Sequence, residues 1–141
     1  MISVMNIKNE QEMQGFAKSF IEVRQLADDP SPAKAVVIAL HGDLGAGKST
    51  FVRAVARELG IEEHVTSPTF NILKTYGNLV HIDAYRLEDE KDLEVLGWEE
   101  LLNNPKNLIF IEWPKNIKSA LPKNTKHLYF EYVDESTRSV K

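Results

Sequence analysis

Apolar residues recur with the period of an α-helix in two stretches of the chain, and both stretches are predicted to be amphipathic helices. The first covers residues 10–27, and its apolar face consists of Met13, Phe16, Ala17, Phe20 and Ile21. It begins after N-E-Q-E from Asn9, which resembles a capping box, and it ends before D-D-P-S-P because proline cannot continue a helix. The second begins at Lys48 and stops at Gly60. Its apolar face consists of Phe51, Val52, Val55, Ala56 and Leu59.

Other stretches have the patterns of β-strands. A-V-V-I-A-L (35–40) and N-L-I-F-I-E-W-P (107–114) are continuous apolar runs, which are typical of strands covered on both faces. The middle of the chain is predicted to be extended, with a hairpin across Gly77-Asn78. The alternating segment K-H-L-Y-F-E-Y-V (126–133) predicts a late strand before a polar tail.

Residues 88–102 are acidic at first and apolar later, so one or two short helices are expected there. The alternation of strands and helices predicts an α/β fold, with a mixed, partly parallel sheet sandwiched between helices. A chain of 141 residues without an internal repeat has the size of one domain, so we expect one domain over residues 1–141 and one site.

Composition excludes several kinds of function. The absence of cysteine excludes disulfides, thiolate nucleophiles and Cys-based zinc sites, and the four histidines have no spacing typical of metal ligands. No apolar run has the length of a membrane span, and the N-terminus does not resemble a secretory signal. We therefore expect a cytoplasmic protein that has no membrane contact.

The net charge of −4 would repel nucleic acid at long range, but one segment differs from the rest of the chain. Residues 106–126 contain five lysines against a single acid, Glu112. These lysines are Lys106, Lys115, Lys118, Lys123 and Lys126. They form either one basic face or a solvated lysine-rich loop region, and the second interpretation is favoured because most charge runs are ordinary surface.

The glycine-rich turn in L-H-G-D-L-G-A-G-K-S-T-F (40–51) is the strongest functional motif. Gly42 to Ser49 match G-x-x-x-x-G-K-S/T in full, which happens by chance in a chain this long on the order of half a per cent of the time. Glycines permit positive φ and expose backbone N–H groups to phosphate oxygens, and the following helix adds the positive end of its dipole. Lys48 is placed for the β- and γ-phosphates, and Ser49 offers a hydroxyl to Mg²⁺. A plain tight turn would require neither Gly-Lys nor the hydroxyl.

Phosphate-loop enzymes hold the metal partly through a carboxylate at the end of a neighbouring strand. Glu112 follows the more hydrophobic strand, which is expected to be central, and Asp83 follows the shorter strand L-V-H-I. Two carboxylates could divide the work between the metal and the attacking water. For each, a strand-end carboxylate facing water is the alternative.

Two further positions have two interpretations each. In S-P-T-F (67–70), Thr69 is either a contact to the γ-phosphate or an exposed residue of a strand that starts at proline. Trp113 is either a core aromatic residue, which composition favours, or a wall near the nucleotide.

Four motifs together strongly resemble the bacterial TsaE (YjeE) family: G-D-L-G-A-G-K-S-T, S-P-T-F, H-I-D-A-Y-R-L and I-E-W-P. The resemblance covers roughly residues 10–138. It implies a P-loop NTPase-like fold and a single P-loop ATPase domain that uses ATP with Mg²⁺. It also implies a role in threonylcarbamoyladenosine (t6A) modification of the adenosine next to the anticodon in tRNAs. The expected partners are the TsaD and TsaB proteins, and tRNA is reached indirectly through that complex.

The resemblance also implies roles for individual residues. Gly45 to Thr50 become the phosphate-binding loop, and Ser49 and Glu112 become the magnesium ligands. The expected catalytic residues are Lys48, Thr69, Asp83 and Glu112. The expected nucleotide-binding residues are Gly42, Asp43, Gly45, Ala46, Gly47, Lys48, Ser49, Thr50, Trp113 and Arg138. Arg138 joins them because D-E-S-T-R-S-V resembles a late arginine-containing strand of the family.

Three functions are compatible with a nucleotide site. The preferred prediction is an ATPase subunit of a tRNA-modifying complex, slow alone and modulated by its partners. A small-molecule or nucleotide kinase is disfavoured because the chain is short and lacks an arginine-rich lid. A non-catalytic, nucleotide-gated binding module is the third possibility. A GTPase is disfavoured because no N-K-x-D motif is present.

Overall fold

The computed structural model describes residues 4–27, 34–43, 46–62, 72–135 and 137–141. The chain divides into two compact units, each of which is described by itself. Unit 1 consists of Met1–Pro30, His41–Thr66 and Leu128–Lys141, and unit 2 consists of Ser31–Leu40 and Ser67–His127. Within the described ranges, no helix combines the length and the apolar character needed to cross a membrane.

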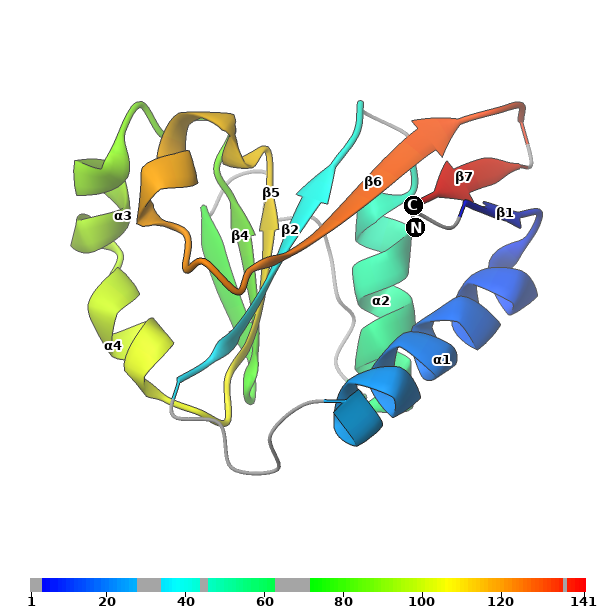
Figure 1. Ribbon diagram of the computed structural model, residues 1–141, viewed down its shortest axis with the longest axis horizontal. Helices are drawn as coiled ribbons and strands as arrows, with labels where there is room; N and C mark the ends of the chain where they lie inside the picture. The colour runs from blue at the N-terminus through cyan, green and yellow to red at the C-terminus, as the bar shows by residue number, and fades with distance from the viewer. Residues whose placement is uncertain (1–3, 28–33, 44–45, 63–71, 136) are drawn as a thin grey trace. The chain divides into compact units, whose positions relative to one another are not determined.

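Unit 1 contains two helices and an antiparallel group of strands. The strands follow the order β1 (Met5–Ile7), β7 (Arg138–Val140) and β6 (Lys126–Tyr132). The helices α1 (Glu10–Ala27) and α2 (Lys48–Glu58) pack side by side (Figure 1). Phe51 of α2 is fully buried, and its ring lies 5.4 to 5.5 Å from the rings of Phe16, Phe20 and Phe130. The apolar faces predicted for both helices therefore meet around Phe51.

The ends of these helices follow from local sequence. Asn9 Oδ1 accepts a hydrogen bond from the Glu12 N–H at 2.8 Å, as the capping-box pattern predicts. Glu12 Oε1 accepts from the N–H of Lys8 at 3.1 Å, so the returning bond reaches one residue further back than in a standard box. Helix α2 ends at Glu58, close to the predicted stop. Leu59 is 45% exposed, contrary to expectation, because it lies at the C-cap, where the chain leaves the helix.

Unit 2 is built on strands in the order β2 (Val36–His41), β5 (Leu108–Glu112), β4 (Leu79–Asp83) and β3 (Leu73–Tyr76). Strand β5 is parallel to both β2 and β4, and β3 and β4 form the predicted antiparallel hairpin. All residues of β5 are buried, so the more hydrophobic run is the central strand of this group, as predicted.

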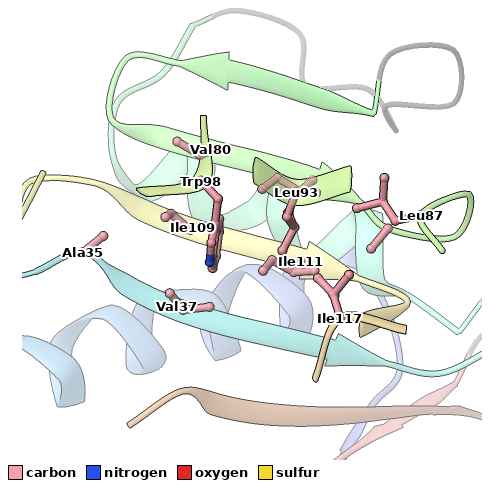
Figure 2. Packing of buried hydrophobic residues seen from close by; sticks show 11 residues of the cluster. Ala35, Val37, Val80, Leu87, Leu93, Trp98, Ile109, Ile111 and Ile117 are labelled. Carbon is pink, nitrogen blue, oxygen red and sulfur yellow. The ribbon is translucent and has the colours of Figure 1, made fainter. Parts of the chain in front are cut away.

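Short helices cover one face of these strands. They are α3 (Glu90–Val95), α4 (Trp98–Asn103) and the 3-10 helix η1 (Pro114–Ala120). Figure 2 shows Leu93 and Trp98 lying over Ile109 and Ile111 of β5 in one apolar cluster. The indole N–H of Trp98 donates to the Ala120 carbonyl at 3.2 Å, which satisfies its polar atom. Because strand residues alternate, the cluster takes every second residue of β4 and β5 and leaves the others to the opposite face.

These observations confirm an α/β fold with a mixed, partly parallel sheet and flanking helices. Helix η1 was not predicted; it occupies part of the lysine-rich segment, which is therefore not simply a loop. Four of the five lysines of that segment are exposed, in keeping with a solvated surface, and Lys126 is half-buried. Strand β1 was not predicted either, because three residues are too few to show a period.

Candidate nucleotide site

The glycine-rich turn leaves β2 at Gly42, where only glycine fits. Its φ is 143°, in the region that other residues rarely adopt. A Cβ atom built on Gly42 would lie 2.5 Å from the backbone oxygen of Phe130 and 3.2 Å from the Cβ of Ala46. The backbone of β6 therefore passes directly against the start of the turn, so both the dihedral angle and the space require glycine.

The turn ends at the N-terminus of α2. Gly47 is the N-cap residue, with φ 105°, and it has no side chain with which to cap the helix. The Ala46 N–H donates to the Asp43 carbonyl at 3.0 Å, and the first bond of the helix runs from the Phe51 N–H to the Gly47 carbonyl at 2.9 Å. The N–H groups that precede Phe51 therefore point out of the helix end, where the helix dipole is positive.

Lys48 folds back over this turn. Its residue is 4% exposed, and its Nζ donates to the Gly42 carbonyl oxygen at 2.5 Å. Ser49 and Thr50 follow on the same helical turn and are half-buried, and Thr50 Oγ1 accepts a hydrogen bond from Arg53 Nη2 at 3.1 Å. A fixed ammonium, a hydroxyl and a helix N-terminus at one turn are the chemical groups that bind phosphate.

Arg138 lies beside the same turn within unit 1. Its Cγ is 3.5 Å from the position of a Cβ atom built on Gly47. Its guanidinium covers the ring of Tyr132 at 4.5 Å, and Nη1 donates to the carbonyls of Asp134 and Thr137 at 2.7 and 3.0 Å. The structure thus brings Arg138 to the phosphate-binding motif, whereas its contact with a nucleotide stays a prediction.

In unit 2, the two candidate carboxylates lie next to each other at the C-terminal ends of neighbouring parallel strands. Glu112 at the end of β5 is in register with Leu40 of β2 and with Asp83 of β4. Glu112 is 5% exposed, and its Oε2 lies 2.5 Å from Nε2 of His81. Asp83 is half-buried, and its Oδ1 accepts a hydrogen bond from the N–H of Tyr85 at 3.0 Å.

Trp113 follows Glu112 in an unusual conformation. In the described part of the chain, Trp113 is the only residue other than glycine with a positive φ, which is 56°. This left-handed conformation costs roughly 1–2 kcal/mol, and such strained residues occur often at functional sites. Trp113 is half-buried, lies outside the apolar cluster of unit 2, and contacts Tyr85 edge-to-face at 5.4 Å. Trp113 is therefore not part of this apolar core, contrary to the interpretation that composition favoured.

Some predicted site residues are not placed by the structure. Gly45 and Thr69 lie outside the described residues, as does the whole S-P-T-F segment. The turn belongs to unit 1, and Asp83 and Glu112 belong to unit 2, so their joint action stays a prediction. Sequence reasoning missed the partner of Glu112, His81. The signal was the alternation in L-V-H-I-D, which places His81 on the same face as Asp83.

Comparisons with known proteins found several similar chains. The family model described as "Threonylcarbamoyl adenosine biosynthesis protein TsaE" matches residues 7–140. The tRNA threonylcarbamoyladenosine biosynthesis protein TsaE of Rickettsia felis is 36% identical over 137 residues, covering 94% of this chain and 74% of the relative. The protein of the same name from Borreliella burgdorferi is 35% identical over 125 residues, covering 86% and 85% of the two chains. The crystal structure of Bacillus subtilis YdiB matches with a TM-score of 0.71 and 28% identity, over 99% of this chain and 84% of that chain. The chain therefore belongs to the TsaE family.

Proposed function

We propose that this chain binds ATP with Mg²⁺ and hydrolyses it as a subunit of the machinery that makes t6A in tRNA. The observation that carries the proposal is the geometry of the turn before α2. There the Lys48 ammonium is held on the Gly42 carbonyl at the N-terminus of α2, which has no side-chain cap. Membership of the TsaE family, whose curated members are named for t6A biosynthesis, supplies the biological process.

The proposed nucleotide contacts begin at the turn. Gly42 to Thr50 cradle the phosphates, and Lys48 neutralises charge at the β- and γ-phosphates. Arg138, which lies against Gly47, and Trp113 are proposed to approach the nucleotide from other parts of the chain. Thr69 is proposed to contact the γ-phosphate.

The donor set suits magnesium. Ser49 supplies a hydroxyl and Glu112 a carboxylate, and Mg²⁺ prefers such hard oxygen donors, with one or two protein ligands beside the substrate phosphates. The chemistry supplied by the bound ion is neutralisation of the charge that develops on the phosphate oxygens. Asp83 is proposed to orient the attacking water, with Oδ1 anchored by Tyr85.

We further propose that TsaD- and TsaB-type proteins are the partners, and that the chain works in the cytoplasm as a single domain. The acidic net charge of −4 supports contact with tRNA only through the complex. Hydrolysis by the isolated chain is expected to be slow and to change when the partners are added.

The proposal is tested with purified protein, a non-hydrolysable ATP analogue and Mg²⁺. Lys48→Ala is expected to weaken analogue binding by about 10- to 150-fold, because charge-assisted hydrogen bonds contribute about 1.5–3 kcal/mol. Lys18→Ala, which changes an exposed lysine of α1, is the matched control and is expected to bind as the wild type does. Glu112→Gln is expected to retain the nucleotide and lose hydrolysis.

Two results would overturn the proposal. The first is identical titration curves for Lys48→Ala and Lys18→Ala. The second is a rate of ATP hydrolysis that stays the same when TsaD and TsaB from the same source cell are added.

A further inference from the structure

His81 and Glu112 form a buried polar pair between neighbouring strands. His81 is 0% exposed and Glu112 is 5% exposed, and the Nε2–Oε2 distance is 2.5 Å. In the strand register, Glu112 lies beside Asp83, while His81 lies beside Phe110. The Glu112 side chain therefore extends toward the start of the parallel strands, by two residues, to reach the imidazole.

The chemistry of the pair fixes the state of the ring. An ionised carboxylate can only accept, so Nε2 of His81 carries the hydrogen and donates it to Glu112. Nδ1 of His81 is buried, and the described residues offer it no hydrogen-bond partner. The arrangement thus suits a hydrogen on Nε2, because an N–H at Nδ1 would be buried without an acceptor among the described residues.

Packing does not explain a histidine at this position. The other β4 residues with full burial, Val80 and Ile82 among them, are apolar, and an apolar residue at position 81 would leave no buried nitrogen unsatisfied. Within the described part of the chain, the side-chain hydrogen bond of His81 goes to Glu112. What the imidazole contributes is therefore a donor that fixes one carboxylate oxygen.

We propose that His81 is a positioning residue that holds Oε2 of Glu112 and so fixes the orientation in which this carboxylate binds magnesium. The inference rests on the proposed role of Glu112 as a metal ligand. Outer hydrogen-bond partners of metal ligands fix the ligand's orientation, and their loss lowers metal affinity or activity by about 10- to 100-fold.

Two substitutions at one position separate the hydrogen bond from the volume of the ring. His81→Leu removes the donor and fills the space of the ring with an apolar side chain. His81→Gln keeps a donor, because Nε2 of glutamine is separated from Cα by as many bonds as Nε2 of histidine. His127→Leu changes an exposed histidine of unit 2 and serves as the matched control.

The decisive measurement uses no turnover. Binding of Mn²⁺ to the full chain with ADP is followed through the electron paramagnetic resonance signal of free Mn²⁺. His81→Leu is expected to weaken Mn²⁺ binding by about 10- to 100-fold. His81→Gln is expected to recover most of that loss, and ADP affinity without metal should match the His127→Leu control in both variants.

The outcomes distinguish this inference from the proposed function. If Glu112→Gln weakens Mn²⁺ binding and His81→Leu does not, the positioning role is wrong and the proposed metal ligand stands. If Glu112→Gln itself leaves Mn²⁺ binding unchanged, the proposed role of Glu112 fails first. A ¹⁵N NMR spectrum of the wild-type imidazoles adds a test that needs no variant to fold. His81 is expected as the Nε2–H tautomer, and an Nδ1–H tautomer would overturn the inference.

Discussion

Gly42→Ala should damage the turn and the fold together. An alanine would have to adopt a φ of 143°, and such strained backbone conformations cost about 1–3 kcal/mol. Its Cβ would also lie 2.5 Å from the Phe130 carbonyl oxygen, a backbone atom that cannot rotate away. Relieving such an overpacked contact typically costs a further 1–3 kcal/mol or so. We therefore expect a loss of about 2–6 kcal/mol in the free energy of unfolding, a large part of the roughly 5–15 kcal/mol of a typical domain.

The matched control is Gly15→Ala. Gly15 lies within α1, and a Cβ atom built there has no neighbour within 4 Å. Alanine is better than glycine inside a helix by about 0.5–1 kcal/mol, so this variant should gain stability. Urea unfolding followed by far-ultraviolet circular dichroism gives both free energies, and titration with the ATP analogue should show weakened binding for Gly42→Ala alone. Equal unfolding midpoints for the two variants would refute the steric reasoning.

The remaining predictions concern packing and capping. Phe51→Ala should lower the free energy of unfolding by about 3–5 kcal/mol, because a fully buried ring that contacts three other phenylalanines is lost. Urea unfolding measures this, and a loss below about 1 kcal/mol would show that the helices do not depend on this contact. Asp89→Ala should cost about 1 kcal/mol, because the Asp89 side chain caps α3 by accepting from the Lys91 N–H at 2.9 Å. Thermal unfolding of Asp89→Ala is compared with that of Asp89→Asn, whose side chain can still cap the helix. Equal losses of stability in the two variants would contradict the capping role.

Local sequence was enough to predict most of the elements. The long helices and the apolar strands have strong periods or long apolar runs, and the hairpin has a turn dipeptide. Helices α3 and α4 were expected from the acidic start and apolar end of their segment. Strand β1 has three residues and is defined by its pairing with β7, which no local pattern reveals. The path of η1 depends on the left-handed conformation of Trp113, which composition does not indicate.

The candidate site also has parts that local sequence predicts and parts that depend on contacts between distant segments. The turn at Gly42 to Ser49 was predicted because the residues of the phosphate-binding motif are consecutive in the sequence. The carboxylates were expected because both end apolar strands. The bond between His81 and Glu112 was not predicted, because it joins residues of two strands far apart in the sequence and depends on their register. The contact of Gly42 with the Phe130 carbonyl is non-local as well.

ATP binding at the turn before α2 is proposed to support t6A synthesis in the cell. It is tested most directly in bacterial cells depleted of their own TsaE, in which this chain is produced as wild type, Lys48→Ala or Lys18→Ala at equal levels. The t6A content of digested tRNA is then measured by mass spectrometry. We expect the wild type and Lys18→Ala to restore t6A and Lys48→Ala to fail to restore it. Full restoration by Lys48→Ala, or none by the wild type, would contradict it.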